Sequence, residues 1–178
     1  MLLMLHIEED MKDIQHPLTQ GILFLLALIG AGIALYLTTV HYEHVPLVCS
    51  TSGIVDCARV TSSAYSVIPS TNVPITVPGL LWAIASAVLA VAGWRMQNQD
   101  RRILLAQLVW SLLGLLAALY LVYVELVLLH TICAWCTGMH VVILIMFLIS
   151  MVQFLNTSAE EDDEVEEESS SLSPASKS

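Results

Sequence analysis

The chain is 178 residues long, which suits one domain of ordinary size. Apolar residues make up 57 % of it and charged residues only 12 %, about half the charged share of soluble domains. This composition excludes an ordinary soluble protein and points to the lipid bilayer as a partner. The net charge of −10 describes the two ends of the chain, where the acidic residues concentrate, and we expect no nucleic-acid partner.

Four apolar runs without a charged residue follow an N-terminal segment, residues 1–17. A helix needs about 20 mostly apolar residues to cross the hydrocarbon core of a bilayer. Each run is long enough or nearly so, and the second is the shortest. The sequence therefore predicts an all-α fold, an integral membrane four-helix bundle over residues 18–155. The four runs are 18–40, 77–94, 103–124 and 131–155.

The basic residues predict the orientation of these helices. Arg95, Arg101 and Arg102 lie in the short connection between the second and third runs. Cytoplasmic loops collect Lys and Arg, so this connection is expected inside the cell. Both termini would then also be cytoplasmic, where Lys12 and Lys177 lie. The expected localisation is a multi-pass protein of a membrane, with segment 1–17 in the cytoplasm.

Two segments outside the runs differ in composition. Residues 41–76, the long connection after the first run, contain Gly and Pro at positions that argue against a long regular helix. Several apolar residues remain there, so the connection is expected to fold back over the bundle as an extracytoplasmic cap. Residues 156–178 are acidic and then Ser-rich, and we expect them to form a disordered cytoplasmic tail.

Two of the four cysteines lie in the long connection. Cys49 and Cys57 are separated by seven residues. Outside the cytoplasm the environment is oxidising, so a structural disulfide that braces the cap is one interpretation and a redox pair is another. No histidine completes a usual zinc-ligand spacing with the cysteines, so no metal site is expected.

The other two cysteines form Cys133-Ala-Trp-Cys136 at the start of the fourth run. Two cysteines three positions apart at a helix start are typical of redox dithiols, because the positive end of the helix stabilises a thiolate. A structural disulfide there would close only a tiny loop and stabilise little. Two dithiols near one face of the membrane suggest a relay, in which one pair meets proteins and the other meets a lipid-soluble carrier.

The residues around these cysteines resemble a known family. The loop from Cys49 to Ser66 places Ser63 six residues after Cys57, Val73-Pro-Ile-Thr-Val-Pro-Gly79 leads into the second run, and Cys133-Ala-Trp-Cys136 opens the fourth. This combination resembles the vitamin K epoxide reductase family, including its bacterial quinone-linked disulfide-forming homologues. The resemblance covers residues from about 18 to 155.

The resemblance implies a four-helix bundle around a quinone of the menaquinone, ubiquinone or vitamin K type. Matched by position, Cys133 and Cys136 reduce the quinone, with Cys136 nearer the ring. Cys49 and Cys57 reload them, and the hydroxyl of Ser63 supports the site. Many bacterial relatives carry a fused thioredoxin-like domain and this chain does not, so a separate thioredoxin-like protein is the expected partner, in a bacterial cell membrane.

Three further residues near the motif are weighed as site residues. Trp135, between the two cysteines, is either a wall of the quinone site or a packing residue. His140 lies four positions after Cys136, and either contacts the quinone and relays a proton or is a satisfied polar group. Glu125 is expected at the membrane interface, near the outer end of the third helix; an acid inside the membrane would instead be a functional candidate.

Two other functions remain open at this point. A structural four-helix membrane protein with a braced loop would explain Cys49 and Cys57 but leaves Cys133 and Cys136 without a role. A vitamin K epoxide reductase that serves a carboxylase would use the same cysteines, although the consecutive residues Asp56-Cys57 resemble the sequence of bacterial relatives. The sequence does not decide which loop cysteine attacks Cys133.

Overall fold

The computed structural model of the chain describes residues 2–43, 45–49, 53–96 and 101–171, with side chains between residues 17 and 159. Over this part the chain is all-α and contains no strand, which confirms the predicted fold class. The elements in chain order are α1 (Leu2–Glu43), α2 (Cys57–Thr61), the short 3-10 helix η1 (Ala64–Ser66), α3 (Thr76–Arg95), α4 (Arg101–Tyr123), the π-helix η2 (Val124–Leu128) and α5 (Ala134–Ser171).

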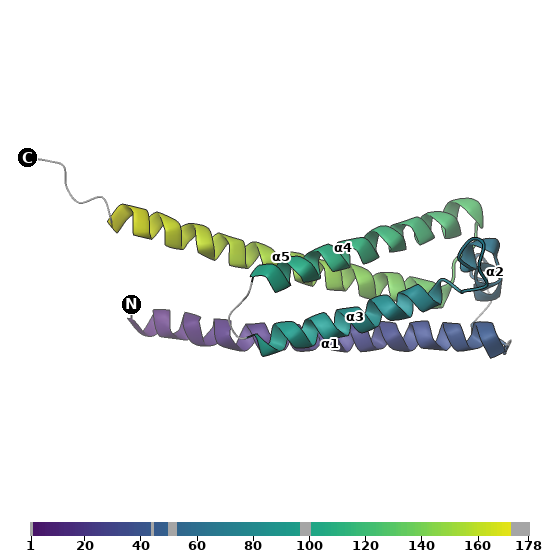
Figure 1. Ribbon diagram of the computed structural model, residues 1–178, viewed down its shortest axis with the longest axis horizontal. Coiled ribbons are helices and arrows are strands. Elements are labelled where there is room, and N and C mark those ends of the chain that lie inside the picture. Colours follow the sequence, from purple (N-terminus) through teal and green to yellow (C-terminus); the bar gives the residue numbers. More distant parts are fainter. Residues whose placement is uncertain (1, 44, 50–52, 97–100, 172–178) are drawn as a thin grey trace, which may run out of the picture.

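Four of these segments are long and apolar enough to cross a membrane, within the described residues. They run side by side in one elongated bundle, with α1 beside α3 and α4 beside α5 (Figure 1). Large apolar side chains cover the outside of the bundle, where lipid would surround them; Leu25, Leu113 and Leu148 are 58 %, 53 % and 49 % exposed. The spans are Pro17–Glu43, Thr76–Arg95, Arg101–Leu128 and Ala134–Ala159.

Both ends of the chain are more helical than the sequence led us to expect. Helix α1 begins at Leu2, although its apolar span begins only at Pro17. Helix α5 continues to Ser171, so the disorder expected from residue 156 is wrong as far as Ser171. Composition showed only that this segment has no apolar face to bury. A Glu-rich segment can extend an existing helix without the cost of a new nucleus. Residues 172–178 lie outside the described residues.

The spanning helices pack through narrow stripes of buried, mostly small residues. The buried positions of α1, α3 and α4 recur at alternating spacings of three and four, the heptad pattern that gives long helices a continuous seam. Small residues in the seam let helix backbones approach closely, which is the main source of helix association in lipid. These positions are Gln20, Leu23, Ala27, Gly30, Ala34 and Leu37 in α1, Ala83, Ser86, Ala90 and Gly93 in α3, and Leu104, Gln107, Ser111, Gly114 and Ala118 in α4.

One glycine shows how closely α3 and α4 approach. A Cβ atom at Gly114 would lie 2.5 Å from Cζ2 of Trp82. The indole of Trp82 therefore fills the space that a side chain at Gly114 would occupy. The indole N–H of Trp82 also donates to the carbonyl of Trp110 at 3.2 Å, so this contact joins the two helices by packing and by a hydrogen bond.

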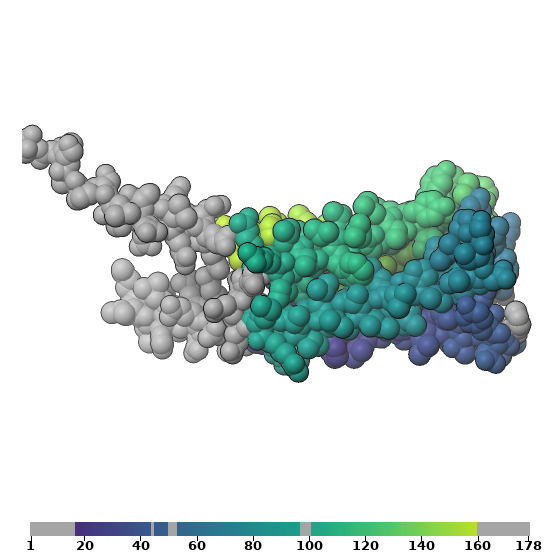
Figure 2. All heavy atoms as spheres, viewed as in Figure 1, coloured from purple at the N-terminus to yellow at the C-terminus, as the bar shows by residue number. Residues whose placement is uncertain are grey.

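The long connection folds over one end of the bundle, as expected for a cap. Helix α2 and η1 lie there, whereas the beginning of α1 and the end of α5 lie at the opposite end (Figure 1). In the space-filling view the cap residues form one packed layer between the end of α1 and the turn before α5 (Figure 2). An isolated antiparallel bridge between Val67 and Pro74 closes the second half of the cap.

Candidate redox site

The end of α4 is a π-helix that leads into a tight turn. In η2 the amide of Leu129 donates to the carbonyl of Val124 at 2.9 Å, and the amide of Thr131 donates to the carbonyl of Glu125 at 2.9 Å. His130 takes a positive φ of 50°, the left-handed conformation that commonly ends a helix. The segment 125–130, between the third and fourth apolar runs, is therefore mostly helical, and π-helical segments of this kind are frequent at functional sites.

Cys133 caps the first turn of α5. Its carbonyl accepts the amide of Thr137 at 2.9 Å, the first hydrogen bond of the helix. Its sulfur accepts the amide of Cys136 at 3.3 Å, in the way that a side-chain oxygen usually caps a helix N-terminus. The Cys136 thiol also donates to the Cys133 sulfur, with 2.7 Å between the two Sγ atoms. The predicted helix-start placement of the pair is confirmed, with Cys133 just before the helix and Cys136 in its first turn.

These contacts favour a thiolate on Cys133. The hydrogen bond from the Cys136 thiol is the largest influence that lowers the pKa of Cys133, and backbone amides at the helix start add to it against the opposing effect of burial. A thiolate at Cys133 would accept all of these hydrogen bonds. Since the thiolate is the nucleophile in disulfide exchange, Cys133 is suited to react with another sulfur.

A short backbone pairing brings the loop cysteines to this helix start. Val55 and Ile132 form an isolated parallel bridge. The amide of Asp56 donates to the carbonyl of Ile132 at 3.1 Å, and the amide of Ile132 donates to the carbonyl of Ile54 at 2.9 Å. Cys57 and Cys133 directly follow the two paired segments, and each is fully buried, with 0 % of its surface exposed.

The two cysteine pairs differ in their bonding. A disulfide joins Cys49 to Cys57, with their Cα atoms 6.1 Å apart. Cys133 and Cys136 are free thiols, the first buried and the second half-buried. In each pair one sulfur is therefore enclosed and the other is more accessible. The two enclosed members, Cys57 and Cys133, are the ones that directly follow the two bridged segments.

A second contact fixes the chain just before Cys49. The indole N–H of Trp135 donates to the carbonyl of Val48 at 2.8 Å, and the amide of Val48 donates to the hydroxyl of Tyr36 at 3.0 Å. The rings of Tyr36 and Trp135 lie 4.8 Å apart between centroids. Both backbone polar groups of Val48 are thus held by this aromatic pair. We call Tyr36, Val48 and Trp135 the loop clamp.

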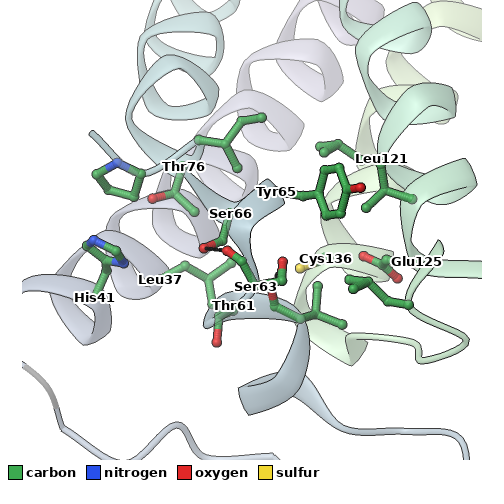
Figure 3. Close-up of a pocket in the computed structure, with 15 residues that line it drawn as sticks. Leu37, His41, Thr61, Ser63, Tyr65, Ser66, Thr76, Leu121, Glu125 and Cys136 are labelled. Carbon is green, nitrogen blue, oxygen red and sulfur yellow. Dashed lines mark hydrogen bonds between the residues drawn. The ribbon is translucent and has the colours of Figure 1, made fainter. Parts of the chain in front are cut away.

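A pocket lies beside the Cys136 sulfur, between the cap and the ends of α1, α3 and α4. Figure 3 shows the Cys136 sulfur between Ser63 on one side and Glu125 on the other. Apolar side chains form much of the remaining wall, among them Leu37, Leu121 and Val124. The predicted site residues Ser63 and Cys136 therefore lie together. The hydroxyl of Ser63 donates to the carbonyl of Val60 at 2.8 Å, which leaves its oxygen able to accept a hydrogen bond.

Trp135 and His140 do not line this pocket, although both were predicted to contact the quinone. Trp135 belongs to the loop clamp, because its indole N–H bonds to Val48 in the segment before Cys49. The path of that segment could not be predicted from the sequence. His140 is half-buried on α5, one turn beyond Cys136. Both residues lie near Cys136 in the sequence, but the walls of the pocket come mainly from the cap, α1, α4 and η2.

Glu125 lines the pocket, a position that was not predicted. It was expected at the membrane interface, yet it is only 5 % exposed and lines the pocket beside Cys136. A signal for this was present in the sequence, because Glu125 follows Ala118 by seven residues and so continues the seam of small residues in α4. The expected interface position relied on its nearness to the helix end alone.

A comparison with known protein families identifies the region that contains these residues. Residues 21–151, more than half of the chain, match the family model described as the vitamin K epoxide reductase family. A search among curated proteins gave no match. The matched region begins in the first apolar span and ends in the fourth, so it contains both cysteine pairs and every residue that lines the pocket.

Proposed function

The chain belongs to the vitamin K epoxide reductase family, and on that premise we propose that it oxidises the thiols of a separate thioredoxin-like protein and passes the electrons to a membrane quinone. Membership in this family makes the protein a membrane redox enzyme that acts on thiols and quinones. The partner, the quinone and a role in forming disulfide bonds are the proposal. The observation that carries it is the arrangement of the four cysteines, from the cap to the pocket.

The pocket fits a quinone by its chemistry. A quinone head group is a flat apolar ring with two carbonyl oxygens, so it needs apolar walls and a few polar groups. Apolar side chains supply the walls, and hydroxyl groups of Ser63, Thr76 and Tyr65 lie among the lining residues. The quinone, when bound, accepts two electrons and two protons. We propose that Cys136, whose sulfur faces this pocket, is the cysteine next to the ring.

We propose that the loop pair acts first. A thiolate of the partner attacks the part-exposed sulfur of Cys49, the disulfide breaks, and the electron pair leaves on Cys57 as a thiolate. In the oxidised state of the second pair, Cys57 then attacks the sulfur of Cys133, and Cys136 leaves as a thiolate. The bridge between Val55 and Ile132 supports Cys57 as the attacking loop cysteine, because it pairs the segments that directly precede the buried residues Cys57 and Cys133.

The loop pair is then restored. The second thiol of the partner frees Cys49 from the mixed disulfide, and the partner leaves oxidised. The Cys49 thiolate attacks Cys57, which re-forms the loop disulfide and frees Cys133. Cys133 and Cys136 now carry the two electrons as a dithiol, and they form their own disulfide again when they reduce the quinone. Each cycle therefore moves two electrons and releases one oxidised partner.

We further propose that the cap faces the outside of a bacterial cell membrane and that both termini are cytoplasmic. The support is the cluster of Arg95, Arg101 and Arg102 at the end of the bundle opposite the cap. A disulfide in the cap also fits an oxidising compartment. Labelling of single cysteines introduced at position 98 and in the cap, from either side of the membrane, would test this orientation. Labelling of position 98 from outside would contradict it.

The function itself is tested with purified protein in detergent or in liposomes. A reduced thioredoxin-like protein is supplied with menaquinone, ubiquinone or vitamin K, and both quinol formation and partner disulfides are measured. We expect one quinol for each disulfide formed, with one quinone class preferred. Oxidation of the partner without any quinol would contradict the quinone step, and no oxidation of any thiol substrate would contradict the whole proposal.

A further inference from the structure

The contacts of the helix-start pair leave one proton on sulfur, the proton of the Cys136 thiol. The Cys133 sulfur accepts hydrogen bonds from both the amide and the thiol of Cys136, so the environment favours a thiolate on Cys133 and a neutral thiol on Cys136. Yet Cys136 is the member that faces the pocket. When the pair closes to a disulfide, both sulfurs must have lost their protons. The proton of Cys136 therefore needs a base within reach.

Glu125 is placed to be that base. Its Oε2 accepts the amide of Cys133 at 3.2 Å, which fixes the carboxyl group at the start of α5, three residues before Cys136. The side chain is 5 % exposed and lines the same pocket as the Cys136 sulfur. Figure 3 shows the carboxyl group turned toward that sulfur. The π-helix and its following turn hold the residue in place.

Within the described part of the chain, no lysine or arginine lines the pocket beside Glu125, so an ion pair with either does not explain its burial. Among the described residues that line the pocket, the other ionisable groups are His41, Tyr65 and Cys136, and none is a lysine or arginine. Cys133 faces Glu125 from the start of α5. An ionisable residue in a membrane-spanning segment is costly and is a functional candidate by default. A neutral residue would serve as well if only packing were needed.

We propose that Glu125 is a catalytic residue that accepts the proton of Cys136 during oxidation of the Cys133–Cys136 dithiol; this inference rests on the proposed function. The S–H bond of Cys136 breaks, the proton goes to the Glu125 carboxylate, and the electron pair stays on sulfur. The two electrons pass to the quinone as the bond between the two sulfurs forms. The quinone takes up two protons. One comes from Glu125, which returns to the carboxylate, and the other comes from solvent water, to which Cys133 gave its proton when it became a thiolate.

A purely structural role for Glu125 makes a different prediction. If its task were only to accept the amide of Cys133, then glutamine would replace it, because a Gln side-chain oxygen accepts the same hydrogen bond. Glu125→Gln keeps the size and the acceptor and removes only the base. Glu43→Gln, at an exposed position near the end of α1, makes the same chemical change away from the site and is the matched control.

The first experiment measures quinone reduction with dithiothreitol as the thiol. Removal of a general base typically slows a reaction by about 100- to 10,000-fold. We expect kcat of Glu125→Gln to fall at least about 100-fold at pH 7, with KM for the quinone and the melting temperature unchanged. The residual rate should rise steadily with pH as hydroxide replaces the carboxylate, whereas the rate of the unaltered protein levels off. A kcat close to that of Glu43→Gln, or parallel pH profiles, would overturn the proposal.

A second experiment needs no quinone, so it separates this inference from the proposed function. The reduced protein with Cys49→Ala and Cys57→Ala is treated with diamide, a small thiol oxidant, and formation of the remaining disulfide is followed by alkylation and mass measurement. We expect Glu125→Gln to slow formation of this disulfide near pH 7. At high pH, where hydroxide replaces the carboxylate as the base, the rate should recover. A slower reaction in protein that reduces no quinone would keep Glu125 as the base and reject the quinone. An equal or faster reaction would reject Glu125 whatever the quinone does.

Discussion

The two ends of the bundle both contain buried polar groups, but they use them differently. At the end opposite the cap, the amides of Gln20 and Gln107 bond to each other at 2.9 and 3.3 Å, and Gln107 also donates to the carbonyl of Leu89. The side-chain amides of Gln20 and Gln107 are thus each bonded to a neighbouring helix. At the cap end, Cys136, Glu125 and Ser63 converge on a pocket instead.

This difference separates a polar contact that joins helices from a polar group that is available for chemistry. In lipid a buried amide pair holds helices together, with a modest contribution for each hydrogen bond. A thiol and a carboxyl group that share a pocket can exchange protons with whatever enters it. The comparison predicts that substitutions at the cap end change rates, whereas substitutions at the other end change stability.

The largest effect is expected at the helix-start pair. Cys133→Ser and Cys136→Ser should each reduce thiol oxidation to the background rate, because the disulfide cannot form with one sulfur. Both proteins should still insert and keep the melting temperature of the unaltered protein within a few degrees, since a hydroxyl replaces the sulfur at similar size. The assay is quinol formation with dithiothreitol, alongside thermal unfolding in detergent. Normal turnover in either variant would remove the redox role from the pair.

The next effect depends on the size of the reductant. In the Cys49→Ala/Cys57→Ala protein, oxidation of a thioredoxin-like partner should fall to background while oxidation of dithiothreitol stays close to normal. A small thiol reaches Cys133 and Cys136 directly, because exchange needs only an attacking thiolate and access to a sulfur. If the loop disulfide only braces the cap, its loss should loosen the pocket and slow both reductants equally. Equal losses would therefore return the loop pair to a structural role.

The sequence predicted the helices and the cysteine placement better than the contacts between them. Apolar run length and the helix-start motif depend on neighbouring residues, so both could be read directly. The bridge of Val55 with Ile132 and the loop clamp join segments more than 75 residues apart through an irregular loop, and no periodic pattern marks them. Glu125 could have been found, because it continues a heptad stripe, whereas the bond of Trp135 to Val48 could not.

A smaller effect should follow from loosening the loop clamp. Trp135→Phe keeps an aromatic ring beside Tyr36 and removes only the N–H that bonds to Val48. A hydrogen bond of this kind is worth about 1 kcal/mol, so oxidation of the protein partner should slow roughly fivefold. The KM for the quinone should stay unchanged, because Trp135 lies outside the pocket lining. A raised KM with a normal partner rate would instead make Trp135 a wall of the quinone site.

The smallest effect on rate is expected at the end of the bundle opposite the cap. Its size tests whether the polar groups at that end have only a structural role. Gln107→Leu leaves the amide of Gln20, which is 0 % exposed, without its partner. An unsatisfied buried amide costs about 1–3 kcal/mol, although such bonds average only about 0.6 kcal/mol in a membrane protein. We expect a lower melting temperature and an unchanged kcat.

The Gln20→Leu/Gln107→Leu protein should recover much of the lost stability, because replacing both partners leaves no amide unpaired. Gln107 also lines a second small pocket together with Ser86, Ser111 and Ser150. These polar groups could take part in the reaction only if that pocket were used. A loss of kcat at normal stability would mean that the polar groups at this end also serve the reaction, and the contrast between the two ends would fail.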